Sequence, residues 1–172
     1  EVGCGNGFIL KRLLKEKKIK NYFGIDFVDD FISLAKKKYK SNRVNFAIFD
    51  ISLTNNRTFD TKYDYIISKR TIQNILSRKM QLNVIDKLGY HLKANGLMIL
   101  VESSQTAQKK INKCRKLFGL PIIKPPFHNL FFDDRIIRNY KFKNIKLLKI
   151  DNFASGFYFL SRIIYASYAK IL

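Results

Sequence analysis

A glycine-rich stretch at the start of the sequence constrains the fold more than any other feature. Residues 1–7 read Glu-Val-Gly-Cys-Gly-Asn-Gly, with glycines at alternate positions behind an acidic and an apolar residue. Glycine is used where a chain needs a positive φ or where a ligand contacts bare backbone. Apolar residues recur at helical spacing over 8–14, so the glycines lie between a strand and a helix that runs to about Lys18. Free N–H groups there attract an anionic ligand, as at the nucleotide-binding corner of a doubly wound sheet.

The spacing of the glycines distinguishes two kinds of nucleotide-binding loop. The dinucleotide fingerprint G-x-G-x-x-G separates its last glycines by two residues, whereas Gly3, Gly5 and Gly7 form G-x-G-x-G. This stretch resembles motif I of the class I S-adenosylmethionine-dependent methyltransferases. The resemblance implies that the loop, Cys4 included, wraps the methionine end of the cofactor, and that Glu1 helps hold the loop and the cofactor's amino group. A glycine-rich turn without a ligand is the alternative.

The composition fits one domain. With 172 residues and 47% apolar content, the chain can bury one sizeable core, and we expect a single domain over residues 1–172. The sequence starts inside the expected first strand, so it looks like a fragment of a longer methyltransferase.

The formal net charge of +20 raises the question of nucleic-acid binding, because clustered lysines and arginines release counterions from phosphate backbones. The lysines are instead scattered along expected helix faces, which indicates solvated surfaces, and we expect no stable nucleic-acid binding. Cys4 and Cys114 are too few and too far apart for a disulfide framework or a metal site. No metal is therefore expected, and the pattern fits a reducing cytoplasm.

An acidic residue ends the first complete strand of the sequence. Residues 21–26 read as a buried strand ending at Asp26, about 20 residues after the glycines, the spacing at which doubly wound folds place an acid on the ribose hydroxyls. The alternative role for an acid here is a helix N-cap, for which Asp29 or Asp30 is better placed. Phe27 would lie against the adenine ring or in the core.

A second acid follows the next strand, expected over residues 44–50. The methyltransferase resemblance implies that Asp50 lies near the adenine amino group and that Asp50 and Ile51 flank the base. Because residues 52–56 are rich in turn formers, a surface turn is the alternative role of Asp50.

A further strand, expected over residues 63–68, is similar to motif IV of the same family. Its end places Ser68 and Lys69 at the cofactor, with Arg70 and Asn74 beside the transferable methyl group, since ligands of open α/β sheets lie outside the carboxyl ends of the strands. The Pro-Pro-aromatic run usual in amino-methylating DNA and RNA enzymes is missing from this point. A helix over 71–92, a turn at 93–96 and a strand over 97–102 complete the cofactor-binding half, residues 1–102.

Residues 103–172 are expected to form a substrate lid followed by a strand and a helix. The lid, residues 120–130, contains all three prolines. Similarity to a methyltransferase subgroup common in bacterial polysaccharide and small-molecule gene sets implies that Asn112, Arg115 and Asn129 bind substrate. His128 is the expected general base, because imidazole titrates near neutral pH and His91 lies away from the ligand edge. A purely structural histidine is the alternative.

The last part of the sequence predicts a helix over 134–140, a sixth strand over 145–151 and a helix over 157–172. Ser161 and Arg162 interrupt this last helix, and it is shorter than the ~20 apolar residues that span a bilayer, so no membrane span is expected. The expected fold is an α/β, doubly wound, mostly parallel sheet of the Rossmann-like class I methyltransferase type, without part of its first strand and without the seventh.

The motifs therefore predict methyl transfer from S-adenosylmethionine to a small-molecule acceptor, of which a sugar hydroxyl is one example. The sulfonium is already a strong methyl donor, so the protein's task is to align a nucleophile and exclude water. Three alternatives stay open: an RNA methyltransferase, a nicotinamide-dependent oxidoreductase and an inactive fragment of the cofactor fold. The glycine spacing argues against the oxidoreductase.

Overall fold

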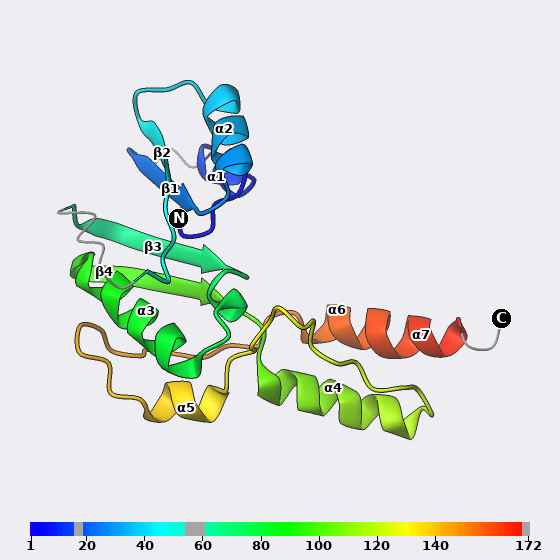
Figure 1. Ribbon diagram of the computed structural model, residues 1–172. Helices are drawn as coiled ribbons and strands as arrows, with labels where there is room; N and C mark the ends of the chain where they lie inside the picture. Colours follow the sequence, from blue (N-terminus) through cyan, green and yellow to red (C-terminus); the bar gives the residue numbers. More distant parts are fainter. Residues whose placement is uncertain (16–18, 54–60, 170–172) are drawn as a thin grey trace.

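The computed structural model describes residues 1–15, 19–53 and 61–169. Its strands form two parallel pairs. Strand β1 (Tyr22–Asp26) pairs with β2 (Val44–Ile48), and β3 (Tyr63–Lys69) pairs with β4 (Leu92–Val101). Figure 1 shows the β1-β2 pair on one side of the N-terminus and the β3-β4 pair on the other.

Val2 joins the two strand pairs into one sheet. It forms parallel bridges with Ile25 of β1 and Ser68 of β3. The Val2 N–H donates to the Ile67 carbonyl at 2.8 Å, and the Ile25 N–H donates to the Glu1 carbonyl at 2.9 Å. The resulting order, β2-β1-Val2-β3-β4, is the 3-2-1-4-5 order of doubly wound sheets, so the predicted fold class is confirmed.

Short helices cover the β1-β2 pair. The glycines lead into α1 (Leu10–Leu13), and β1 leads into α2 (Asp29–Lys38). The apolar face of α2 buries Ile32 and Ala35 against the two strands, in a small core that also contains Leu10 and Phe46. The helix expected up to Lys18 is thus much shorter within the described residues. The N-cap of α2 is Val28, and Asp29 and Asp30 lie inside its first turn, where their charges still favour the helix dipole.

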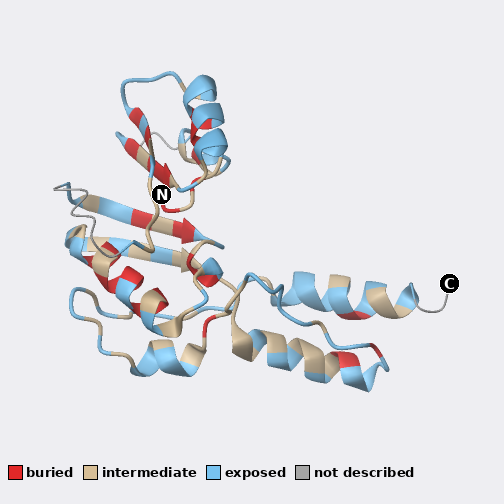
Figure 2. Cartoon of the chain, viewed as in Figure 1, coloured by how far each residue is buried: buried red, intermediate tan, exposed pale blue. Residues whose placement is uncertain are grey.

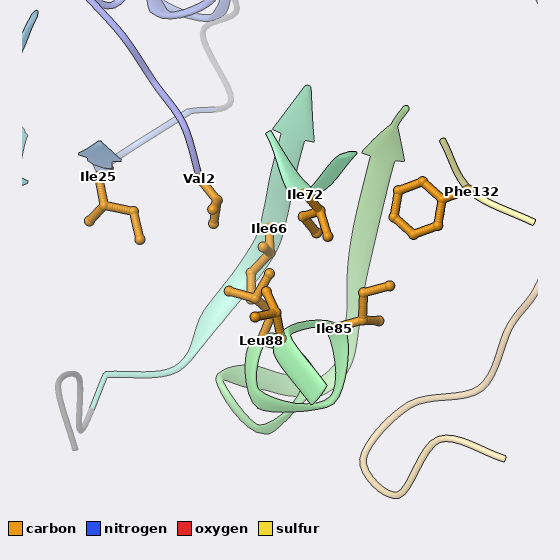
Figure 3. Close-up of a cluster of buried hydrophobic side chains, with 8 residues drawn as sticks. Val2, Ile25, Ile66, Ile72, Ile85, Leu88 and Phe132 are labelled. Carbon is orange, nitrogen blue, oxygen red and sulfur yellow. The ribbon is translucent and has the colours of Figure 1, made fainter. Parts of the chain in front are cut away.

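A second core lies between the sheet and α3 (Arg78–Tyr90). Figure 3 shows side chains from the N-terminal strand, β1, β3, α3 and the segment near residue 132 converging there, and its labelled members are Val2, Ile25, Ile66, Ile72, Ile85, Leu88 and Phe132. Because residues from distant parts of the chain meet at this point, the cluster fixes where Val2 sits between the two strand pairs.

The predicted helix over 71–92 is wrong in its first part. The chain forms a short 3₁₀ helix, η1 (Ile72–Asn74), and α3 begins only at Arg78, where the Ser77 hydroxyl accepts the Met80 N–H at 3.4 Å. Ser77 is a good N-cap, so the helix starts there. Residues 93–96, predicted as a turn, belong to the long strand β4. The pairing of β4 with β3 is irregular there, and Asn95 has a φ of 63°.

Beyond β4 the regular elements are helices, joined by long segments without regular structure. It forms α4 (Gln105–Leu117), α5 (Asp134–Asn139), and a continuous C-terminal helix made of α6 (Ser155–Phe159), the π-helical η2 (Leu160–Ile164) and α7 (Tyr165–Tyr168). The helices expected over 134–140 and from 157 onward are therefore confirmed within the described residues. Figure 2 shows that the C-terminal helix is largely exposed.

The predicted sixth strand, 145–151, is wrong, because these residues have no regular structure. The segment is held by α3 instead of a sheet edge. A Cβ at Gly89 would lie 2.6 Å from the Ile145 side chain, so Ile145 packs directly on this glycine. The Asp86 carboxylate also accepts the Lys143 N–H at 2.8 Å. These contacts fix the backbone in a path that does not pair with β4.

We expect Ile85→Ala to lower the free energy of unfolding by about 2–5 kcal/mol, because Ile85 is 2% exposed at the centre of the second core. Leu148→Ala is the matched control, since that side chain is 74% exposed and should change stability by about 0.5 kcal/mol or less. Urea denaturation measures both. Equal effects would mean that this cluster does not hold the fold.

Candidate cofactor site at the switch point of the sheet

The glycine loop lies at the carboxyl end of the central strand. All three glycines have a positive φ: 70° at Gly3, 52° at Gly5 and 76° at Gly7. The N–H groups of Gly3 and Cys4 both donate to the Ile25 carbonyl, at 2.8 and 3.0 Å. The loop is therefore a specific left-handed turn tied to β1, at the point where the order of a doubly wound sheet reverses and ligands bind.

The surroundings of the glycines show which one can meet a ligand. A Cβ at Gly3 would lie 1.9 Å from the Thr71 hydroxyl, and one at Gly7 would lie 2.7 Å from the Tyr39 ring. A Cβ at Gly5 would have no heavy atom within 4 Å. Gly3 and Gly7 are thus required by the protein's own packing, whereas Gly5 leaves bare backbone facing open space, as a bound cofactor needs.

The Cys4 thiol donates to the Gly5 carbonyl at 3.6 Å within the loop. The Cys4 side chain is buried in the α2 core, and burial raises the pKa of the thiol to about 12. A thiol with this raised pKa is protonated at neutral pH, which argues against a nucleophilic role.

Asp26 lies where the sequence predicts it. One carboxylate oxygen accepts the Gly5 N–H at 2.8 Å, and the other accepts the Val28 N–H at 3.1 Å. A carboxylate has about four acceptor positions, so it can still bind ribose hydroxyls while holding the loop. Phe27 beside it is 67% exposed, so the core alternative for Phe27 is wrong and its ring is available to an adenine.

The hydrogen bond of the Glu1 side chain lies outside the glycine loop. Its carboxylate accepts the Tyr22 hydroxyl at 2.5 Å, toward the start of β1, and burial raises the pKa of Glu1. The role implied for Glu1 at the cofactor's amino group is therefore not supported by this geometry. Glu1 instead lines a cavity of about 670 Å³ whose walls include Ile51 and His91 but none of the loop glycines.

Asp50 is engaged in a turn. One carboxylate oxygen accepts both the Ser52 N–H at 2.8 Å and the Ser52 hydroxyl at 2.6 Å. The turn that was the alternative reading of this residue is therefore present. A role for Asp50 and Ile51 beside the adenine stays a prediction, and part of the turn-rich stretch, residues 54–56, lies outside the described residues.

The carboxyl end of β3 carries an exposed cationic pair, Lys69 and Arg70. Arg70 has a φ of 56°, which is rare and strained for a residue with a side chain. Its backbone is held in that state because its N–H donates to the Val101 carbonyl at 2.9 Å and its carbonyl accepts the Asn74 side-chain amide at 3.3 Å. Asn74 therefore positions Arg70, and the substrate contact predicted for this exposed residue stays a prediction.

Glu102 organises this end of the sheet, although sequence reasoning treated it only as the end of a strand. Its carboxylate accepts the N–H groups of Thr71, Ile72 and Gln73 at 3.1–3.2 Å, as well as the Ser68 hydroxyl at 3.3 Å. Ser68 is fully buried, so it supports Glu102 and cannot touch a cofactor as predicted. Burial raises the pKa of Glu102, while the hydrogen bonds lower it by a smaller amount.

Two buried glutamines fasten the end of the lid. The Gln81 amide donates to the carbonyls of Ile72, Ile75 and Leu130 at 2.8–3.2 Å. Gln73 donates to the Asn129 side chain at 2.6 Å and accepts the Ser103 N–H at 2.9 Å. Asn129 is thus a structural partner of Gln73. Sequence reasoning missed both glutamines, whose only signal is a polar residue at an inward position.

Asn112 and Arg115 fasten the other end of the lid. The Asn112 side chain exchanges two hydrogen bonds with the backbone of Ile123, both 2.9 Å. Arg115 is buried and donates to the carbonyls of Pro121, at 2.6 Å, and Arg162. The predicted substrate-binding role is wrong for both residues in this conformation, because their polar atoms bind the chain's own backbone.

His128 is exposed at the outer turn of the lid. Its ring packs edge-on against Phe127, with centroids 5.1 Å apart, and it has no hydrogen bond within the part of the chain that the structure describes. A general base needs a fixed orientation toward the proton it takes, which this environment does not provide. Its catalytic role stays a prediction.

These features define a nucleotide-type cofactor site on a doubly wound sheet. The methyltransferase domain family matches residues 1–98, more than half of the chain. The chain therefore belongs to the methyltransferase domain family, within the class I S-adenosylmethionine-dependent methyltransferases, and the resemblance read from the glycine loop is confirmed.

Curated relatives of this chain are methyltransferases as well. Two are malonyl-[acyl-carrier protein] O-methyltransferases: that of Bacillus cytotoxicus is 31% identical over 99 residues, and that of Priestia megaterium is 26% identical over 165 residues. The matches cover 58% and 88% of this chain, but 33% and 58% of those proteins. The chain thus spans about a third of the length of the first relative.

Solved structures share the fold. An S-adenosylmethionine-dependent methyltransferase from Clostridium acetobutylicum aligns with 66% of this chain and 44% of its own, at 24% identity and a TM-score of 0.53. PKMT2 from Rickettsia typhi, solved with AdoHcy, aligns with 69% of this chain and 23% of its own, at 22% identity and a TM-score of 0.55. Among the described helices, none is long and apolar enough to cross a membrane.

The glycines should respond differently to substitution. Gly5→Val should weaken binding of S-adenosylhomocysteine at least about tenfold, because its side chain occupies the ligand's space, and should cost only about 1–2 kcal/mol of stability through its positive φ. Gly3→Ala should instead lower stability by about 2–4 kcal/mol, since its Cβ meets Thr71 as well. Calorimetric titration and thermal unfolding separate the two effects. Wild-type affinity in Gly5→Val would make the loop a turn without a ligand.

Glu102→Ala should lower the free energy of unfolding by about 2–4 kcal/mol, because buried N–H groups lose their acceptor. Glu102→Gln keeps one acceptor oxygen and should lose about half as much. Hydrogen exchange of the amides at Thr71–Gln73 locates the effect. If these amides stay protected in Glu102→Ala, the carboxylate does not hold η1.

Proposed function

We propose that the whole protein transfers the methyl group of S-adenosylmethionine to a small-molecule acceptor. The acceptor atom is an oxygen of a carboxylate that an acyl group carries. Gly5, Asp26 and Phe27 would hold the cofactor. The observation that carries the acceptor class is the strained, backbone-clamped Arg70 beside Lys69 at the carboxyl end of β3. A guanidinium binds a carboxylate through two parallel hydrogen bonds, so this pair suits an anionic acceptor.

The acidic residues near this pair leave it available. The Glu102 carboxylate is occupied by backbone N–H groups and Ser68, and Asp26 is turned to the loop amides. The described residues contain no ion pair to Lys69 or Arg70. The charge of Lys69 acts on the Glu1 carboxylate, whose pKa it lowers, but that carboxylate accepts the Tyr22 hydroxyl and forms no ion pair with Lys69. Cations without an ion pair raise the local concentration of an anionic ligand. The malonyl-[acyl-carrier protein] O-methyltransferases named above support this acceptor class, because a malonyl group carries a carboxylate.

A carboxylate acceptor also explains the lid. The bound cofactor supplies a methyl group already activated by its sulfonium, and an ionised carboxylate can accept it without losing a proton. No general base is then required, and residues such as Asn112, Arg115 and Asn129 can serve to hold the lid. A sugar hydroxyl must lose a proton, so it would need His128 as base, and His128 is exposed and unanchored. The carboxylate is therefore the better-supported acceptor.

The proposal includes the organisation of the chain. Residues 1–172 act as one methyltransferase domain with its cofactor half in 1–102, working in a reducing cytoplasm where Cys4 and Cys114 stay free. We also propose that stable nucleic-acid binding is absent, which distinguishes this function from RNA methylation.

The test compares acceptors and variants. The protein should transfer labelled methyl groups to a malonyl thioester but not to the thioester of its amide, and Arg70→Ala should lower kcat/KM about 10–100-fold, the scale of a lost charged hydrogen-bond pair. Arg43→Ala is the control, because that exposed arginine lies in the turn just before β2. Titration with S-adenosylhomocysteine and NAD checks the cofactor separately. Methylation of a hydroxyl acceptor with no response to Arg70→Ala would overturn the carboxylate proposal.

A further inference from the structure

The two C-terminal helical elements form an arm that projects from the sheet. We call α4 together with the helix from Ser155 to Tyr168 the C-terminal arm. Figure 1 shows the two helices side by side, extending away from the strands. They are joined by Ile163, which is fully buried, and by Arg115, which donates to the Arg162 carbonyl. A buried arginine and a buried isoleucine make the arm a packed unit.

The surface of the arm is unusually apolar. On the C-terminal helix Phe157, Leu160, Ile164 and Tyr168 recur at helical spacing and are 45–68% exposed, and Tyr165 beside them is 71% exposed. Single exposed apolar residues are normal on a protein surface, but a continuous stripe marks a binding surface.

The charge of the arm and its neighbourhood has a single sign. Residues 103–132 and 152–172 contain no aspartate or glutamate, so all 13 acidic residues of the chain lie elsewhere. On α4, Lys109, Lys113 and Lys116 recur one helical turn apart and are exposed. Other stretches of the sequence, such as residues 31–49 and 135–150, also lack acids, but on α2 the lysines at the end of the helix follow Asp29 and Asp30 in its first turn. The arm differs because its lysines occur together with the exposed apolar stripe.

We propose that the arm binds the surface of an anionic phospholipid bilayer, lying in the interface without crossing it. Helices of this kind combine an apolar face rich in aromatic residues with lysines and arginines, and bind through buried apolar area and attraction to anionic headgroups. Tyrosine suits this boundary because its ring is apolar and its hydroxyl stays hydrated. A projecting pair of helices can lie on a flat surface while the sheet, with the Gly5 loop, remains in water.

The experiment is co-sedimentation of the full chain with vesicles of phosphatidylglycerol and phosphatidylcholine, or of phosphatidylcholine alone. We expect binding to the anionic vesicles and at least about tenfold weaker binding to the neutral ones. Phe157→Ser/Leu160→Ser should weaken anionic binding about tenfold or more, and Phe31→Ser/Leu34→Ser, an exposed pair with the same spacing on α2, should not.

The charge contribution is measured separately. Lys109→Ala/Lys113→Ala should weaken anionic binding about 10–30-fold at physiological salt, whereas Lys36→Ala/Lys40→Ala, with the same spacing near α2, should have a much smaller effect. Unchanged thermal unfolding confirms that each variant is folded. Equal binding to both vesicle types, no binding to either, or no difference between arm and control variants would overturn the proposal. The proposal would also be overturned if sedimentation analysis showed that the arm forms a dimer interface and that the dimer does not bind vesicles.

Discussion

The hydrogen bonds of two residues, Glu1 and Val2, hold the described sheet together across its centre. They connect Ile25 of β1 with Ile67 of β3, and through these strands they connect α2 with α3. The glycine loop starts at the next residue, so its position follows directly from this junction. Any shift of Val2 would move Gly5 relative to both Asp26 and Arg70, which come from opposite halves of the sheet. The second core, built around Val2, resists that shift.

Hydrogen bonds of buried polar groups, more than apolar packing, stabilise the carboxyl edge of the sheet at the site. Glu102 gathers the N–H groups that open η1, and Gln73 and Gln81 tie η1 to the lid. Each of these groups would be costly to bury alone, so together they specify one arrangement of the carboxyl edge. The strain at Arg70 is stable for the same reason, since its N–H and carbonyl are both fixed by neighbours.

Sequence reasoning succeeded where a residue's role depends on local pattern. The glycine spacing, the strand ending at Asp26 and the parallel strands all follow from periodicity and turn chemistry, and they identify the fold and family. It failed where partners that are distant in the sequence determine the role of a residue. Asn112 and Arg115 precede the predicted lid and Asn129 lies in it. Nothing in their own sequence neighbourhood shows that Ile123, Pro121 and Gln73 are their partners. The strand predicted over 145–151 failed because packing on Gly89 overrides its local propensity.

The positive charge of the chain can likewise be interpreted only from the groups that surround each cation. A net charge of +20 spread over many helix faces says little, because most of those lysines are solvated. At two places the groups around the cations differ from those around the solvated lysines. At the carboxyl end of β3, the Arg70 backbone is clamped and the Glu102 carboxylate is engaged with backbone N–H groups, which suits the small anion that we propose as acceptor. On the arm, acids are missing from whole segments and the lysines lie beside an exposed apolar stripe, which suits a large anionic surface. What distinguishes these two sites is therefore less the number of lysines than the surroundings of the cations, a clamped backbone at Arg70 and an exposed apolar stripe on the arm.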